Sequence, residues 1–164
     1  MTTDPQAFPS VAHDHADCVR AALEAAVAQC ERHGSRLTSL RRRVLELVWD
    51  SHEPVGAYAL LDTLKAEGHN AAPPTVYRAL DFLIAQGLVH RLERMNAFVG
   101  CSRPDAPHSA QFLICSGCGR FAELDDPAIG TAVATAAAAL GFTVSRQTIE
   151  VEGRCTECRE SPVL

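Results

Sequence analysis

The sequence predicts an α+β protein in which a winged helix-turn-helix domain precedes a small α/β domain stapled by metal. Three observations predict this fold. The first half of the chain repeats the apolar spacing of amphipathic helices and ends in two short alternating runs. The second half has the pattern strand, strand, helix, strand. Two Cys-x-x-Cys pairs, Cys115 with Cys118 and Cys155 with Cys158, lie in that second half.

Composition and charge narrow the class of protein. No run of about 18 apolar residues occurs and the N-terminus lacks a signal pattern, so we expect a cytoplasmic protein with no membrane partner. Seven cysteines are an odd number, and in a reducing compartment paired cysteines favour metal over disulfides. The net charge is −5, but residues 32–94 carry nine Lys and Arg against seven acids. A surface for nucleic acid therefore has to lie in this middle block.

The first half of the chain predicts four helices. Residues 1–15 contain Pro5 and Pro9 but no apolar period, so we expect a mobile tail there. Apolar residues then recur three and four positions apart, Thr38 can cap the second helix, and Pro73-Pro74 can open the fourth. The helices are expected over residues 17–32, 38–48, 57–67 and 73–86.

A hairpin follows the fourth helix. The alternating runs over residues 88–93 and 97–101 are separated by three residues, and helices followed by a hairpin predict a winged helix-turn-helix domain over residues 16–101. A recognition helix places its N-terminal end in the major groove of DNA. On the fourth helix, the side chains opposite the apolar stripe near that end are Thr75, Tyr77 and Arg78. The alternative is that Tyr77 is half-buried and Arg78 simply solvated.

The second half predicts a linker and a small domain. Prolines stiffen the linker over residues 102–109, and the domain occupies residues 110–164. Its strands are expected over residues 111–114, 120–124 and 142–151, with an alanine-rich helix over residues 128–140. With few large side chains this domain is too small to be stable alone, so we expect a metal staple and a dimer partner.

The two Cys-x-x-Cys pairs predict a closed metal site. Two residues between cysteines let both thiolates of one knuckle reach the same ion, and two knuckles complete a tetrahedral, structural zinc site. The ligands of this site are Cys115, Cys118, Cys155 and Cys158. The alternative is a set of unligated thiols or a redox pair.

A second group of donors lies around the linker, on the two hairpin strands, in the linker itself and beside the first knuckle. Its members are His90, Cys101, His108 and Glu123. Their spacing alone does not select them, since a single His or Cys is more often packed or solvated. Their location does, because an ion bound by all four would hold one domain against the other. A further cluster of His13, Asp14, His15 and Cys18 is better explained as scattered donors in a tail.

Several motifs are specific in combination: PPTVYRALDFL at residues 73–83, QGLVH at 86–90, CSGCG at 115–119 and CTEC at 155–158. These residues resemble the ferric uptake regulator superfamily, specifically its zinc uptake regulator branch, and the similarity covers about residues 20–158. The resemblance implies a homodimeric repressor with an N-terminal winged helix and a C-terminal dimerisation domain. Such a repressor binds a palindromic double-stranded DNA operator when zinc is bound, and represses genes of zinc acquisition.

The resemblance also implies site residues and a cofactor. It implies about two zinc ions per subunit, one structural and one regulatory. It matches the four knuckle cysteines to the structural site and the set His90, Cys101, His108 and Glu123 to the regulatory site. For DNA contact it matches Tyr58, Thr75, Tyr77 and Arg78. One thiolate, two imidazoles and one carboxylate suit tetrahedral zinc, whereas an iron or manganese sensor favours nitrogen and oxygen ligands.

Other functions remain as alternatives. An iron or peroxide sensor on the same scaffold conflicts with Cys101 as a ligand. A zinc hydrolase or deaminase needs an open coordination position, and no H-x-E precedes a cysteine pair. A thiol oxidoreductase needs a reactive Cys-x-x-Cys thiol of low pKa. We therefore expect no enzymatic activity and no small-molecule substrate.

Overall fold

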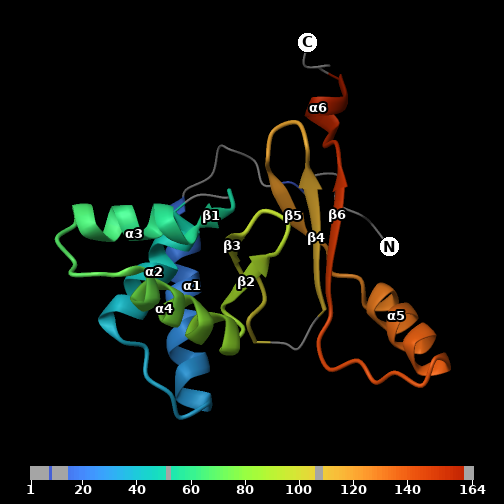
Figure 1. The fold of residues 1–164 in the computed structure, drawn as a ribbon, viewed down its shortest axis with the longest axis horizontal. Coiled ribbons are helices and arrows are strands. Elements are labelled where there is room, and N and C mark those ends of the chain that lie inside the picture. The colour runs from blue at the N-terminus through green and yellow to red at the C-terminus, as the bar shows by residue number, and fades with distance from the viewer. Residues whose placement is uncertain (1–7, 9–14, 51–52, 106–108, 161–164) are drawn as a thin grey trace. The chain divides into compact units, whose positions relative to one another are not determined.

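The computed structural model describes residues 8, 15–50, 53–105 and 109–160, which form two compact units (Figure 1). The first unit contains the described residues from 15 to 105, and the second contains residues 109–160. Helices and a small sheet make up the first unit, and a second sheet with its own helices makes up the second. The predicted α+β fold is confirmed. In these residues no helix has the length and apolar character needed to cross a membrane.

The first unit contains the four predicted helices, and their ends follow the sequence signals. Thr38 caps the second helix, since its side chain accepts a hydrogen bond from the backbone N–H of Arg41 at 3.4 Å. Gly68 and Gly87 follow the third and fourth helices with φ of +85° and +72°, a conformation that costs glycine little. The helices are α1 His15–Arg32, α2 Ser39–Trp49, α3 Ala57–Ala66 and α4 Pro73–Ala85.

The core of the first unit comes from the apolar faces of these helices. Val44 of α2, Leu64 of α3 and Leu80 of α4 each have 0% of their surface exposed. Burial of such side chains is the main source of stability for a helical unit of this size. The core orients α4, because its buried face turns the opposite face to solvent.

The predicted hairpin forms the wing of the first unit. Strands β2 Val89–Leu92 and β3 Ala97–Gly100 pair antiparallel, and Asn96 takes the positive φ of 46° in the turn between them. The sequence analysis missed a third strand, β1 Val55–Gly56, which pairs with β3. Two residues are too few to produce an alternating pattern. This strand therefore forms because β3 offers backbone groups to pair with, and not because of its own sequence.

The second unit is built on a three-stranded sheet in the order β5-β4-β6. Strand β4 Ala110–Cys115 lies in the centre, pairs antiparallel with β5 Phe121–Glu123, and pairs parallel with β6 Thr148–Gly153. Helix α5 Pro127–Ala139 connects β5 to β6 and has no buried residue. In Figure 1, α5 stands apart from the sheet of its own unit.

Two predictions for the second unit are corrected. The last strand was expected from residue 142, but β6 begins at Thr148. Its partner β4 begins at Ala110, which pairs with Thr148, so the preceding residues have no neighbouring strand to bond. The structure also contains a short helix, α6 Thr156–Glu160, that the sequence analysis missed because it covers little more than one turn.

Candidate metal centres and nucleic-acid interface

The two cysteine pairs meet because β4 and β6 run parallel. Cys115 ends β4 and pairs in register with Gly153, the last residue of β6. The carboxyl ends of parallel strands lie at one edge of a sheet, so the turn after Cys115 and the segment after Gly153 emerge side by side. Ser116 fixes this arrangement, since its backbone N–H and its hydroxyl both donate to the carbonyl of Gly153, at 2.8 and 3.0 Å.

The four knuckle cysteines form one compact cluster. The Sγ atoms of Cys115, Cys118, Cys155 and Cys158 all lie within 4.8 Å of one another. The cluster depends on a glycine in the first knuckle, because a Cβ on Gly117 would lie 2.9 Å from the Sγ of Cys158. All seven cysteines belong to the described residues, and all are free thiols.

Neighbouring groups set the charge of the cluster. The pKa of Cys115 is lowered to about 6, because the backbone N–H of Cys155 donates to its Sγ at 3.4 Å and stabilises the thiolate. The pKa of Cys118 is also lowered, first by Arg120, whose Nε donates to its Sγ at 3.3 Å. By contrast, a hydrogen bond with Cys155 and partial burial raise the pKa of Cys158 to about 12. The cluster therefore favours some thiolates but needs a cation to hold all four.

The cluster fits zinc in both geometry and chemistry. Four sulfurs about 2.3 Å from a tetrahedral zinc ion lie about 3.8 Å apart. The Sγ atoms of Cys118 and Cys155 are 3.9 Å apart, and every other pair in the cluster lies within 4.8 Å. Four sulfur donors leave no open position for a substrate, so the site can stabilise the fold but cannot do hydrolytic chemistry.

The structure describes three of the four residues predicted for the second site. Cys101 follows β3, and its backbone N–H donates to the carbonyl of Leu88 at 3.0 Å, which extends the hairpin ladder by one pair. Side chains two residues apart on a strand share a face, so His90 lies on the same face as Cys101, diagonally across the hairpin. Glu123 is the last residue of β5 in the second unit, and His108 lies outside the described residues. This set stays a prediction.

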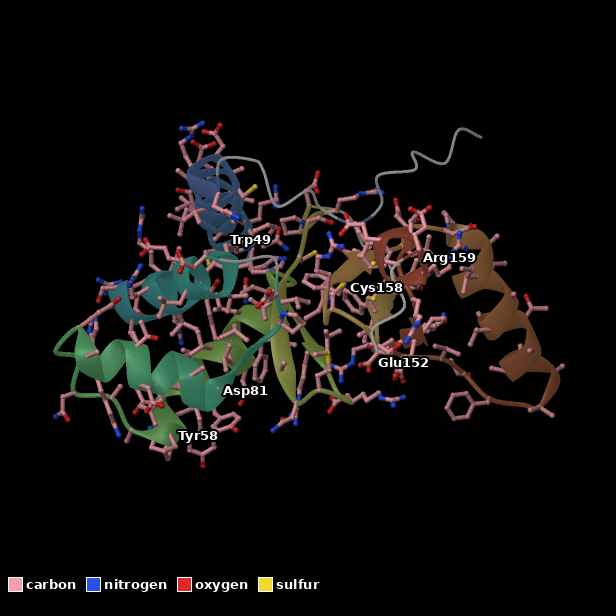
Figure 2. The ribbon with its side chains drawn as sticks, turned by 90° about the horizontal axis from the view of Figure 1, so that it is seen from above. Trp49, Tyr58, Asp81, Glu152, Cys158 and Arg159 are labelled. Atoms are coloured by element: carbon pink, nitrogen blue, oxygen red, sulfur yellow. The ribbon has the colours of Figure 1, made fainter. Side chains whose placement is uncertain are left out.

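The predicted DNA-contacting residues differ in exposure. Arg78 is exposed on α4, and its Nε donates to the carbonyl of Pro74 at 3.3 Å. Tyr58, near the start of α3, is 64% exposed and is labelled with Asp81 of α4 in Figure 2. Thr75 and Tyr77 are half-buried, and Tyr77 packs against the core. Arg78 and Tyr58 are therefore free to reach a ligand, while Tyr77 has less surface to offer.

Three consecutive arginines, Arg41 to Arg43, lie at the start of α2 and could contact phosphates or form an ordinary solvated face. Two of them bond to carboxylates: Arg42 to Glu46 at 3.2 Å, and Arg43 to Glu67 at 2.6 Å. The guanidinium of Arg41 lies 3.6 Å from the centre of the Phe82 ring. The contacts of Arg43 and Arg41 tie α2 to the end of α3 and to α4, whereas the Arg42 pair lies within α2. These contacts favour a structural role for Arg41 and Arg43.

Gln111 is the buried polar residue of β4. It is 2% exposed, and its Nε2 donates to the carbonyl of Asp126, just before α5. It thereby holds the start of α5 to β4. The N-terminal donors of the sequence analysis are only partly described: His15 and Cys18 lie on α1, while His13 and Asp14 are outside the described residues.

Comparison with known proteins identifies the family. The ferric uptake regulator family matches residues 32–152. The zinc uptake regulation protein of Escherichia coli (strain K12) is 40% identical over 132 residues, covering 80% of this chain and 77% of that protein. The chain belongs to the ferric uptake regulator family, in its zinc uptake regulator branch. The family resemblance predicted from the sequence is thus confirmed.

Solved structures of the branch share the fold. A zinc uptake regulator complexed with zinc and DNA is 38% identical, with a TM-score of 0.82, covering 87% of this chain and 95% of that one. The crystal structure of holo XcZur is 46% identical, with a TM-score of 0.78, covering 88% of this chain and 99% of that one. The family members that resemble this chain are transcription regulators, which agrees with the expectation that it is not an enzyme.

Proposed function

We propose that the chain is a zinc-responsive transcriptional repressor, which binds a palindromic operator as a zinc-loaded homodimer and represses genes of zinc acquisition. The observation that carries this proposal is the similarity to a zinc uptake regulator complexed with zinc and DNA, at a TM-score of 0.82 over 87% of the chain. This chain has the two features that such a function needs, an exposed face on α4 and a cluster of four cysteines.

The cysteine cluster is proposed as the structural zinc site, held by Cys115, Cys118, Cys155 and Cys158. Zinc bound by these four thiolates would cross-link the two knuckles. The four ligands come from two knuckles that follow neighbouring strands, so their ligation ties β4 to the C-terminal end of the chain. This contribution is needed because the second unit has a small core, with Phe112 as its one fully buried large side chain among the described residues.

The second set is proposed as the regulatory zinc site, held by His90, Cys101, His108 and Glu123. Support comes from the shared face of His90 and Cys101 on the hairpin and from the donor types, which suit tetrahedral zinc. These residues belong to both units, so ligation would make the arrangement of the units depend on zinc. With the cysteine cluster, the proposal gives about two zinc ions per subunit.

Helix α4 is proposed to enter the major groove of the operator. Arg78 can donate to two acceptors of one guanine, and such a contact contributes about 1–3 kcal/mol of base discrimination. Tyr58, Thr75 and Tyr77 are proposed to contact the DNA backbone or thymine methyl groups. The exposure of Arg78 and Tyr58 supports these roles.

The homodimer is proposed to form through the second unit. Strand β6 is at the edge of its sheet, and α5 has no buried residue although most of its residues are apolar. Exposed apolar surface and an open strand edge both favour association. The large apolar side chains exposed on this unit are Val133, Leu140, Phe142 and Val151.

Operator affinity measured against free zinc tests the proposal. His90→Ala and Cys101→Ser should each abolish the zinc-dependent increase in affinity, while a matched pair of controls, His69→Ala and Cys18→Ser, should leave it unchanged. Unchanged zinc-dependent binding in the first pair would refute the regulatory assignment. Full activation by ferrous or manganous ions in place of zinc would favour an iron or peroxide sensor instead.

A second arm of the experiment tests the DNA interface. Arg78→Ala should weaken binding to the operator by about 1–3 kcal/mol and relax the base preference at one position. Arg42→Ala removes the same charge from a side chain that is paired with Glu46 on α2, so it should have little effect. Equal losses for the two variants would mean that Arg78 acts only through long-range charge.

A further inference from the structure

Arg120 contacts two sulfurs of the cysteine cluster at once. It follows the first knuckle, and its Nε donates to the Sγ of Cys118 at 3.3 Å while its Nη2 donates to the Sγ of Cys155 at 3.6 Å. These two cysteines belong to different knuckles, so one guanidinium spans both halves of the cluster. The side chain of Arg120 is only 14% exposed, although arginine side chains usually extend into solvent.

Glu157 holds this guanidinium in place. Its carboxylate accepts hydrogen bonds from Nη1 of Arg120 at 3.3 Å and from Nη2. Glu157 lies on α6 between Cys155 and Cys158, so the segment that carries the second knuckle also orients the arginine. Because the carboxylate side chain is 76% exposed, water screens its charge, whereas the guanidinium acts on the sulfurs from a partly buried position.

The hydrogen bonds from Arg120 act on sulfurs that carry excess negative charge when zinc is bound. Four thiolates around one divalent cation carry a net charge of −2, and the excess electron density lies on the sulfurs. A charged N–H donor withdraws some of that density and so makes a sulfur less nucleophilic. Cys118 needs this most, because it is exposed while Cys115 and Cys155 are buried.

We propose that Arg120 is a positioning residue that protects the zinc-bound thiolates of Cys118 and Cys155 from electrophiles and oxidants. The inference rests on the proposed structural zinc site and adds a residue to it. The guanidinium lowers the reactivity of the two sulfurs that it contacts. It does not contact Cys115 or Cys158, so the reactivity of those two sulfurs should not depend on it. A structural site with such protection keeps its zinc under conditions in which an unprotected thiolate site would lose it.

The test uses the zinc-loaded full chain and iodoacetamide, whose iodide is displaced by the attacking sulfur. Mass spectrometry of peptides gives the initial alkylation rate at each cysteine before a second modification occurs. Arg120→Gln should raise the initial rates at Cys118 and Cys155 about tenfold. Arg120→Lys keeps the charge but cannot bond both sulfurs, so it should give an intermediate rate at Cys118.

Arg159→Gln is the matched control, since Arg159 is exposed on α6 beside Cys158 (Figure 2) and loses the same charge. Its rates should equal those of the unmodified sequence. Equal rates in Arg120→Gln and Arg159→Gln would overturn the role of Arg120, as would an equal rise at all four ligands, which indicates general loosening. A different result would refute the proposed zinc site itself: the four cysteines would be alkylated at the same rates before and after a chelator is added.

Discussion

Gly100, the last residue of β3, lies so close to Trp49 that a larger side chain at this position should destabilise the first unit. A Cβ at this residue would lie 2.2, 2.3 and 2.6 Å from three ring atoms of Trp49. Carbon atoms in contact are about 3.5–4.0 Å apart, so Gly100→Ala forces an overlap of more than about 1 Å against a rigid ring. Trp49, labelled in Figure 2, ends α2 and packs against the core, so moving its ring away would disturb that packing.

The size of the effect follows from this overlap. Overpacking costs about 1–3 kcal/mol, and contact with three ring atoms places Gly100→Ala near the upper end of that range. Trp49→Leu removes the ring that the new methyl would meet. In that background Gly100→Ala should cost less than about 1 kcal/mol, which gives a coupling of about 2 kcal/mol in a double-mutant cycle.

Urea unfolding followed by the helical circular dichroism signal measures these costs, because the longest helices with buried faces belong to the first unit. With a slope of about 2 kcal/mol per molar urea, Gly100→Ala should lower the midpoint by about 1 M. Gly56→Ala is the matched control in the same sheet, since nothing lies within 4 Å of its Cβ position and its φ is −79°. A similar midpoint for both variants, or an unchanged cost in the Trp49→Leu background, would refute the reasoning.

Further perturbations test the second unit. Gly117→Ala should weaken zinc binding about tenfold in a chelator competition, because its methyl would crowd the Sγ of Cys158, whereas Gly153→Ala meets no atom within 4 Å and should bind normally. Zinc affinity should fall more steeply below pH 6 than above it, because Cys115, with its pKa lowered to about 6, is a thiolate above that pH and must release an extra proton below it. Calorimetry in buffers of different ionisation enthalpy counts the protons released on zinc binding. An equal count below and above pH 6 would contradict the lowered pKa of Cys115. If the proposed homodimer forms through the second unit, Val151→Arg on the edge strand should shift its sedimentation toward that of a monomer.

The sequence was informative where local chemistry decides the structure. Helices α2 and α4 were predicted from their apolar spacing, from the Thr38 cap and from the two prolines of α4, and the structure has all of these features. Strand β1 and the start of β6 were not predictable in this way. Each depends on which residues a partner strand offers, and that information lies elsewhere in the chain.

In the candidate metal centre, too, local sequence predicts some features, while others depend on distant parts of the chain. The spacing of the two knuckles predicted which cysteines gather, because ligand geometry fixes that spacing. Arg120 was not predicted, although it follows a knuckle directly. Its contact with Cys155 and its partner Glu157 both depend on the parallel pairing of β4 with β6, and one arginine among many carries no sequence signal of such a role.

If both proposed sites bind zinc, the distribution of their ligands between the units would give the two sites different purposes. The four cysteines of the cluster all belong to the second unit, so zinc bound there would not depend on how the units are arranged. In the proposed regulatory site, His90 and Cys101 belong to the first unit and Glu123 to the second, so part of the free energy of zinc binding would go into fixing the arrangement of the units. Under this proposal we expect the regulatory site to bind zinc more weakly than the cysteine cluster. By reciprocity, a bound operator should then raise the zinc affinity of the regulatory site by the same factor by which zinc raises operator affinity.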